Sequence, residues 1–163
     1  MPRALVALGA NLGDVRATLR AAARALQELS DGPFAAASMW GSDPADCPPG
    51  SPRFLNSAVS FRTSLGPVPL LDVLQALEAR AGRVRGIVNA PRTLDLDLID
   101  YGGLVIRTPR LTLPHPRVVE RDFVLAPLAE LDPNLRLNTE ETVAELLSRV
   151  EAHNLDRLGP VFG

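Results

Sequence analysis

The chain between residues 3 and 99 shows the periodicities of strands and helices in the order strand, helix, strand, strand, helix, strand. Residues 3–8 form an apolar run that ends at Gly9, and Asp14 is placed to cap a helix with an apolar stripe. The expected strands are 3–8, 34–40, 53–63 and 93–99, and the expected helices are 14–29 and 68–81. This order predicts an α+β, ferredoxin-like βαββαβ fold, in which helices pack on one face of an antiparallel sheet.

The remainder of the chain predicts shorter additions to that core. A hairpin turn at residues 101–104 leads into a strand at 104–106, and a short extended piece follows at 110–113. Helical additions are expected near residues 122–131 and 139–150. A chain of 163 residues is long enough to bury a core, so we expect residues 1–163 to form a single domain.

Composition excludes several classes of protein. Hydrophobic residues make up 46% and charged residues 22% of the chain, and no apolar run approaches membrane-spanning length. The net charge of −2 does not favour a nucleic-acid partner. Cys47 is the only cysteine, so the chain has no internal disulfide. We therefore expect a cytoplasmic monomer that binds neither nucleic acid nor a membrane.

A pair of carboxylates lies in the last expected core strand. Residues 94–98 read Leu-Asp-Leu-Asp-Leu, which places the leucines on one face and Asp95 and Asp97 on the other. Asp is a poor strand former, and the two charges repel one another unless a cation lies between them. Mg²⁺ takes oxygen ligands and commonly adds substrate phosphates. A solvent-facing strand with incidental acids is the alternative, and for the two acids alone it is the better one.

Arginines in the same part of the chain favour the metal interpretation. The sequence contains no lysine, so all 17 of its Lys+Arg residues are Arg. Those nearest the Asp pair are Arg80, Arg83, Arg85, Arg92, Arg107, Arg110, Arg117 and Arg121. Arg presents paired, planar donors that suit phosphate. Carboxylates for a metal beside arginines for an anion predict a metal–polyphosphate site.

Two further stretches suggest ligand contacts. Phe54 and Asn56 are expected on the strand face opposite Leu55. An exposed ring beside an amide suits a flat heterocycle, although packing under a loop is the commoner role for such a Phe. His115 lies in the stretch Leu-Pro-His-Pro, where it either donates to a phosphate or hydrogen-bonds its own turn.

Several common site motifs are absent from the sequence. A Walker A loop needs a lysine, and the turn at residues 9–14 does not match G-x-G-x-x-G, so any ATP is bound by another device. With two histidines and one cysteine, a structural zinc site is excluded. The serines lack the G-x-S-x-G context of a hydrolase nucleophile.

Four stretches together carry a resemblance to a known family. They are LGANLGD at residues 8–14, FLNSAV at 54–59, PRTLDLDLI at 91–99 and LTLPHPRVVERDFVLAPLAEL at 111–131. In this order, and over residues 4–147, the chain resembles the hydroxymethyl-dihydropterin pyrophosphokinases of folate biosynthesis. The resemblance implies a ferredoxin-like fold and Mg²⁺-dependent transfer of pyrophosphate from ATP to the pterin hydroxymethyl group, with release of AMP.

The same resemblance implies roles for individual residues. Asp95 and Asp97 would bind two Mg²⁺ ions, and they form the catalytic group together with Arg83 and Arg92. Phe54 and Phe123 would sandwich the pterin, and Asn56 would hydrogen-bond its edge. The residues implied in ATP binding are Gln75, Glu78, Arg83, Arg85, Arg92, Leu98, Arg110, Thr112, His115 and Arg121. Among these, Leu98, Arg110 and Thr112 would hold the adenosine.

The chain departs from the family pattern in its loops. Val88 and Asn89 stand where the family commonly carries Arg-Trp, and this loop is a residue short. We expect Arg83 and Arg85 to compensate, so that activity survives with altered loop closure. The loop at residues 42–52 also differs from the usual Thr-Pro version, and Pro116 removes a hydroxyl that could contact phosphate.

Three other interpretations remain open from the sequence. RNA-recognition modules share the fold, but the net charge and the lack of an aromatic-rich basic strand argue against one. A two-metal phosphodiesterase generally needs more His and carboxylate ligands than this chain offers. The third interpretation is an inactive relative of the pyrophosphokinases, and the altered loop at residues 83–90 is the only reason to consider it.

Overall fold

The computed structural model describes residues 1–44, 49–81 and 94–162 of the chain. Cys47 and three predicted site residues, Arg83, Arg85 and Arg92, lie outside these ranges. The strands are β1 Arg3–Ala10, β2 Phe34–Ala36, β3 Ser38–Ser42, β4 Phe54–Arg62, β5 Asp95–Tyr101, β6 Ile106–Arg107, β7 Thr112–Leu113 and β8 Asp156–Pro160. The helices are α1 Val15–Glu28, α2 Pro67–Arg80, α3 Asp122–Leu131 and α4 Val143–Leu147, and a 3-10 turn, η1, spans Val118–Glu120.

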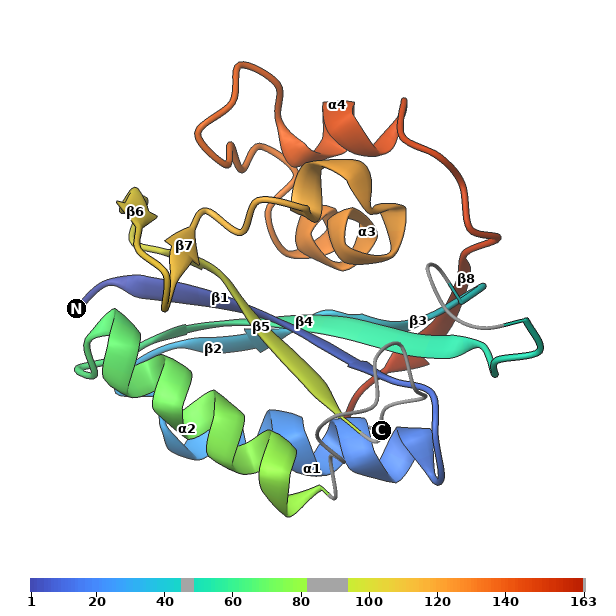
Figure 1. The fold of residues 1–163 in the computed structure, drawn as a ribbon, viewed down its shortest axis with the longest axis horizontal. Coiled ribbons are helices and arrows are strands. Elements are labelled where there is room, and N and C mark those ends of the chain that lie inside the picture. Colours follow the sequence, from blue (N-terminus) through green and yellow to red (C-terminus); the bar gives the residue numbers. More distant parts are fainter. Residues whose placement is uncertain (45–48, 82–93, 163) are drawn as a thin grey trace.

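Six of the described strands form one twisted antiparallel sheet with a helical layer on each side, and β6 and β7 form a separate two-stranded sheet (Figure 1). The strand order is β5-β1-β4-β3-β8, and β2 also pairs with β4. The fourth strand of the predicted βαββαβ core, β5, therefore lies beside the first. The predicted fold class is confirmed.

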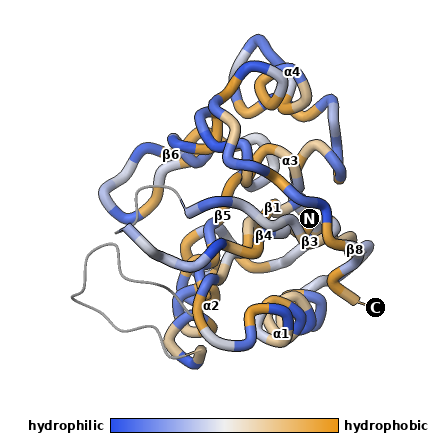
Figure 2. Tube along the Cα trace, turned by 90° about the vertical axis from the view of Figure 1, so that its right-hand side faces the viewer, coloured by the Kyte–Doolittle hydropathy of each residue, from blue (hydrophilic) through white to orange (hydrophobic). Residues whose placement is uncertain are grey.

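Helices α1 and α2 cover one face of the sheet through apolar packing. The side chain of Asp14 accepts a hydrogen bond from the backbone N–H of Ala17 at 3.2 Å, so α1 begins at the predicted cap. The apolar stripe of α1 is buried as expected and consists of Leu19, Ala22, Ala23 and Leu26. Hydrophilic residues occupy its outer side, and both kinds are visible along the helix in Figure 2. This face holds the larger core cluster, which includes Leu70 and Leu74 of α2.

The C-terminal helices α3 and α4 cover the opposite face of the sheet (Figure 1). Leu125 and Leu128 of α3 pack against Leu5 and Ala58 of the sheet in a second core cluster. α3 begins and ends at the predicted residues. The expectation of helices on one face is therefore confirmed for the βαββαβ core, and the C-terminal additions account for the other face.

Several predicted boundaries are wrong. β1 does not end at Gly9 but continues to Ala10. The strand expected at 34–40 is two strands, β2 and β3, which both pair with β4. Of the strand expected at 104–106 only Ile106 is in a strand, β6, which pairs with β7. The backbone N–H of Leu104 instead donates to the carbonyl oxygen of Tyr101 in a turn.

The C-terminal region differs most from expectation. The helix expected at 139–150 is α4 alone, and a capping box between Thr142 and Glu145 sets its start. β8 was not predicted, since its five residues alternate too weakly to be recognised as a strand, and it pairs with β3 at the sheet edge. No helix within the described ranges has the length and apolar character needed to cross a membrane.

Candidate active site

The two carboxylates of β5 project from the sheet face that α3 covers. Leu96 and Leu98 are buried in the core cluster on the α1 and α2 side, as the alternation predicts. Asp97 pairs with Ala7 of β1, which belongs to the cluster under α3, so Asp97 lies on that side. The Asp97 side chain is 35% exposed, and Asp95 is likewise half-buried. Both carboxylates can therefore be reached by a ligand.

One glycine, Gly9, lies on the sheet between a predicted metal ligand, Asp95, and a residue predicted to bind a heterocycle, Asn56. Gly9 of β1 is paired with Asn56 of β4 on one side and with Asp95 of β5 on the other. Neighbouring strands lie about 4.8 Å apart, so Asn56 and Asp95 are separated by about 10 Å. A Cβ added at Gly9 would meet Asn56 Oδ1 at 3.6 Å and a ring carbon of Phe54 at 3.9 Å. Glycine at this position therefore leaves the surface between them open.

The amide of Asn56 is held in one orientation. Its Nδ2 donates to the carbonyl oxygen of Trp40 at 3.0 Å and to Ser42 Oγ at 2.9 Å. Because a backbone carbonyl only accepts, the nitrogen must face Trp40 and the oxygen must face Gly9. Asn56 is buried and Phe54 is half-buried, so the ring is less exposed than the sequence suggested. The site thus offers a fixed acceptor beside an aromatic ring.

Glu78 of α2 supports the start of β5. This carboxylate is buried, and its Oε2 accepts the backbone N–H of Leu96 at 2.9 Å. Leu96 lies between the two aspartates, so the contact fixes the strand segment from which both project. The structure therefore gives Glu78 a supporting contact besides its predicted role in ATP binding.

His115 lies against the carboxylates. Its backbone N–H donates to the carbonyl oxygen of Ile99 at 2.9 Å, which fastens the segment after β7 to β5. Its ring Nε2 is 4.0 Å from Asp97 Oδ1, too far for a hydrogen bond but close enough for both to face one ligand. The ring Nδ1 accepts the backbone N–H of Arg117 at 3.4 Å. A neutral ring therefore carries its proton on Nε2.

The surroundings of His115 favour that neutral form. Burial lowers the pKa of His115, and the charges of Arg121 and Arg117 lower it further, while Asp95 opposes them. The ring is then an uncharged donor at neutral pH, aimed at the space beside Asp97.

Phe123 lies at the first turn of α3. The guanidinium of Arg121 is 5.7 Å from the centre of its ring, within range of a cation–π contact. The ring of His153 meets it edge-on, with 5.5 Å between centroids and 84° between planes. Arg121 and Phe123, both predicted from one motif, are thus in contact, and His153 joins them from the C-terminal segment.

The residues predicted to hold adenosine lie at the edge strand β5 and near α2. Arg110 donates to Gln75 Oε1 at 3.3 Å and forms an ion pair with Asp72, so two of the predicted residues meet. Thr112 lies on β7 and is exposed. The Leu98 side chain is buried in the core, so only its backbone is left to contact a ligand.

Sequence reasoning missed the residues that hold the site in place. Trp40 and Ser42 orient Asn56, and the buried Asp122 pairs with the half-buried His153 beside Phe123. Asp122 stands next to a predicted residue in the sequence, which was the one available signal. His153 has no pattern around it that points to a site.

The described residues do not form a complete protein cage for a metal ion. No group of three or more His, Cys, Asp or Glu within residues 1–44, 49–81 and 94–162 is arranged to hold one. Two half-buried carboxylates on one strand face nevertheless fit Mg²⁺, which is commonly bound by one or two carboxylates together with substrate phosphates and water.

Sequence comparison relates the chain to named enzymes. A protein from Pseudomonas aeruginosa, named 2-amino-4-hydroxy-6-hydroxymethyldihydropteridine pyrophosphokinase, is 42% identical over 157 residues, which cover 96% of each chain. A protein of the same name from Haemophilus influenzae is 36% identical over 160 residues, covering 98% of this chain and 100% of its own. The likeness therefore spans the described sheet and both helical layers.

Structural comparison agrees on the fold. A crystal structure of Plasmodium falciparum HPPK-DHPS superimposes with a TM-score of 0.73 at 13% identity, over 91% of this chain. This chain spans 44% of that larger protein. The profile of one family, described as 7,8-dihydro-6-hydroxymethylpterin-pyrophosphokinase (HPPK), matches residues 5–133. The chain therefore belongs to the 7,8-dihydro-6-hydroxymethylpterin-pyrophosphokinase family.

Proposed function

We propose that this chain transfers pyrophosphate from ATP to the hydroxymethyl group of 6-hydroxymethyl-7,8-dihydropterin and releases AMP, as a step of folate biosynthesis. The observation that carries the proposal is the row Asn56, Gly9, Asp95 across three strands. It sets an acceptor for a heterocycle about 10 Å from a carboxylate for a metal. That spacing suits a pterin ring whose hydroxymethyl group points toward a metal-bound polyphosphate.

The pterin end of the site rests on Asn56 and two rings. Asn56 Oδ1 is an acceptor of fixed position, and the amino and ring N–H groups of a pterin are donors. Phe54 on β4 and Phe123 at the start of α3 supply the two faces of the sandwich, since α3 packs on β4. Stacking orients the hydroxyl for in-line attack on the phosphorus.

The ATP end rests on groups that complement negative charge. His115 Nε2 is a donor beside Asp97. Arg121 is the residue that precedes α3. Arg110 and Gln75 form a polar pair near α2 where an adenosine can bind. Arg83, Arg85 and Arg92 remain proposed phosphate contacts outside the described residues.

Asp95 and Asp97 are the proposed ligands of two Mg²⁺ ions. When bound with ATP, the ions would neutralise charge on the phosphates and polarise the phosphorus that is attacked. The chain's own contribution is to hold the two carboxylates on one strand face, which Glu78 supports through the backbone of Leu96. Positioning of this kind accounts for most of the catalysis in phosphoryl transfer.

We also infer that residues 1–163 form a single pyrophosphokinase domain. α3 packs on the sheet face opposite α1 and α2, α4 packs on α3, and β8 extends that sheet, so no part of the described chain forms a separate core. A monomer remains a prediction, which sedimentation of the purified chain would test.

An assay that separates AMP from ADP tests the proposed function most directly. The purified chain is incubated with Mg²⁺, ATP and 6-hydroxymethyl-7,8-dihydropterin, and both nucleotide products are quantified by chromatography. We expect AMP and pterin diphosphate in equal amounts. ADP with a pterin monophosphate would indicate ordinary kinase chemistry, and absence of turnover would favour an inactive relative.

A further inference from the structure

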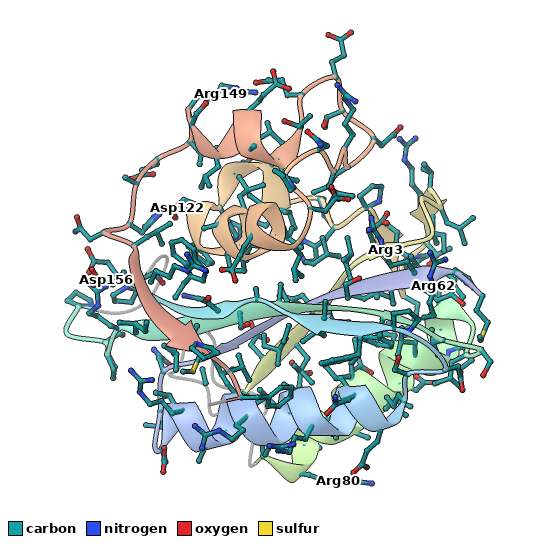
Figure 3. All side chains as sticks on the ribbon, turned by 180° about the vertical axis from the view of Figure 1, so that it is seen from behind. Arg3, Arg62, Arg80, Asp122, Arg149 and Asp156 are labelled. Carbon is teal, nitrogen blue, oxygen red and sulfur yellow. The ribbon has the colours of Figure 1, made fainter. Side chains whose placement is uncertain are left out.

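The segment His153–Asp156, which follows α4 and ends at the first residue of β8, contacts both sides of the proposed pterin site. Figure 3 shows Asp122 and Asp156 at the same end of the molecule, where this segment descends from α4 to the sheet edge. The segment lies outside the residues matched by the family profile, which end at residue 133. The residues that it contacts, Asp43, Arg53 and Asp122, lie within the matched range.

On the α3 side, the segment binds Asp122 with two hydrogen bonds. The backbone N–H of His153 donates to Asp122 Oδ2 at 2.7 Å, and its ring Nδ1 lies 2.7 Å from Asp122 Oδ1. Because the carboxylate accepts, Nδ1 carries the proton of this bond. Asp122 is 3% exposed, so both contacts form in a site shielded from water. The His153 ring then stands edge-on against Phe123.

On the β4 side, the segment binds Arg53, which directly precedes Phe54. The Arg53 guanidinium donates to the carbonyl oxygen of Asn154 at 2.9 Å and to Asp156 at 3.0 Å. It also donates to Asp43 at 2.6 Å, and the backbone N–H of Asp43 donates to the carbonyl oxygen of His153 at 2.8 Å. The segment is therefore tied to β4 and to the end of β3.

Each proposed stacking ring thus follows immediately after a residue held by this segment. Phe54 follows Arg53, and Phe123 follows Asp122. We propose that His153–Asp156 acts as a clamp that sets the separation of the two stacking rings, with His153 as a positioning residue for Phe123. The inference rests on the proposed function, because it assigns the rings to the pterin.

The separation of the two rings matters because stacking on both faces of the pterin is strong only over a narrow range of ring-to-ring distances. Dispersion attraction falls by a quarter to a half when a gap of about 0.5–1 Å opens between surfaces. Phe54 is on a strand and Phe123 is on a helix of another layer, so their spacing depends on contacts between layers. A clamp bound to both residues restricts that spacing before the pterin arrives, which lowers the ordering cost of binding.

The central test compares His153→Ala and Arg53→Met with the unchanged chain. The pterin KM is measured at saturating ATP, kcat is taken from the same curves, and the affinity for α,β-methylene-ATP is measured by calorimetry. Without the clamp, the stacking residues must be ordered when the pterin binds, and that ordering costs enough to raise a dissociation constant by up to about tenfold. We expect the pterin KM to rise about tenfold in each variant, with kcat and nucleotide affinity changed less than about twofold.

Two further variants separate positioning from loss of fold. His153→Asn keeps an N–H that can reach Asp122, so we expect it to restore most of the pterin affinity lost in His153→Ala. Arg149→Ala removes an exposed ion pair with Glu141 near α4, away from the clamp, and serves as the matched control (Figure 3). We expect its pterin KM to equal that of the unchanged chain. The double variant His153→Ala/Arg53→Met should lose less than the product of the single losses, because both act through one segment.

Hydrogen exchange supplies a readout that does not depend on turnover. In His153→Ala we expect faster exchange at residues 53–55 and 122–124 than in the unchanged chain, and no change in α1. An unchanged pterin KM in both single variants, or equal losses of pterin and nucleotide affinity, would overturn the clamp. If the unchanged chain produces no AMP, the proposed function fails, and unchanged exchange at both segments would then also overturn the clamp.

Discussion

The two faces of the sheet are covered by helices in different ways. On the α1 and α2 face the contacts are almost wholly apolar, and residues such as Leu19, Leu26 and Leu74 are fully buried. On the α3 face the apolar contacts stop short of the open surface between Asn56 and Asp95. Polar pairs such as Asp122 with His153 hold the elements there.

The difference shows how one sheet divides stability from chemistry. A strand with period-2 alternation can bury one face in a core and leave the other accessible, and residues 95–98 of β5 do so. Apolar packing on the first face contributes stability in proportion to buried area. The second face carries the half-buried carboxylates Asp95 and Asp97, and His115 Nε2 lies 4.0 Å from Asp97 Oδ1. Variants on the two faces should therefore separate activity from stability.

The largest effect is expected at Asp97. Asp97→Ala removes one of the two proposed metal ligands, so we expect turnover to fall about a thousandfold or more, equivalent to about 4 kcal/mol in the activation barrier. The melting temperature should change by no more than about 2 °C, because the Asp97 side chain is 35% exposed and lies outside both core clusters. Initial rates of AMP release at several Mg²⁺ concentrations check the first outcome, and calorimetry checks the second.

Asp95→Ala should behave in the same way, and Glu141→Gln provides the control. Glu141 is a distant acidic residue paired with Arg149 on the surface. Near-normal turnover in either Asp variant would contradict the metal assignment, as would an equal loss in Glu141→Gln.

The opposite outcome is expected on the α1 face. Leu26→Ala leaves a cavity in a fully buried site, and such substitutions cost about 2–5 kcal/mol of unfolding free energy. We expect a loss of about 3 kcal/mol in urea unfolding, with kcat at low temperature changed less than about twofold. A large fall in kcat at temperatures where the variant is fully folded would show that the two faces are not independent.

Glu78 connects the two faces, so its variants sharpen the comparison. Glu78→Ala leaves the Leu96 N–H without this acceptor, which costs about 1–3 kcal/mol of unfolding free energy. Because Leu96 lies between Asp95 and Asp97, turnover should fall as well. Glu78→Gln keeps a carbonyl oxygen at this position and should retain most of the stability. The free energy of unfolding and the rate of AMP release are measured for both variants. If the comparison holds, Glu78→Ala lowers both quantities, whereas Asp97→Ala lowers only the rate and Leu26→Ala lowers only the stability.

The smallest effect concerns Asp100, a buried residue near the end of β5. Burial raises the pKa of Asp100, although hydrogen bonding to Gly103 and the charge of Arg3 oppose the rise. A carboxyl whose pKa is raised on folding contributes stability below its unfolded pKa and loses it as pH rises through the folded pKa. Asp100→Asn should therefore increase the melting temperature by no more than about 2–4 °C at pH 7, and by less at pH 3. A decrease at pH 7 would show that the Arg3 charge outweighs burial.

Local patterns were enough to predict the βαββαβ core and that Asp95 and Asp97 point away from the face that the leucines bury. Asp14 caps α1, and the alternation of residues 94–98 separates leucines from aspartates, because both effects act over a few residues. The motif around His115 was predicted as a unit for the same reason. The predicted strand boundaries were wrong where a short strand is defined by its pairing with another, as at residues 104–106.

The sequence by itself determined which residues of these elements face the core and which face away from it, since side-chain direction along a strand or helix follows from its period. Only the tertiary structure decided that Gly9 lies between Asn56 and Asp95, and that β8 completes the sheet. It also decided that His153 meets Asp122 across 31 positions of the chain. Such contacts depend on how separate elements pack, and no local periodicity records that.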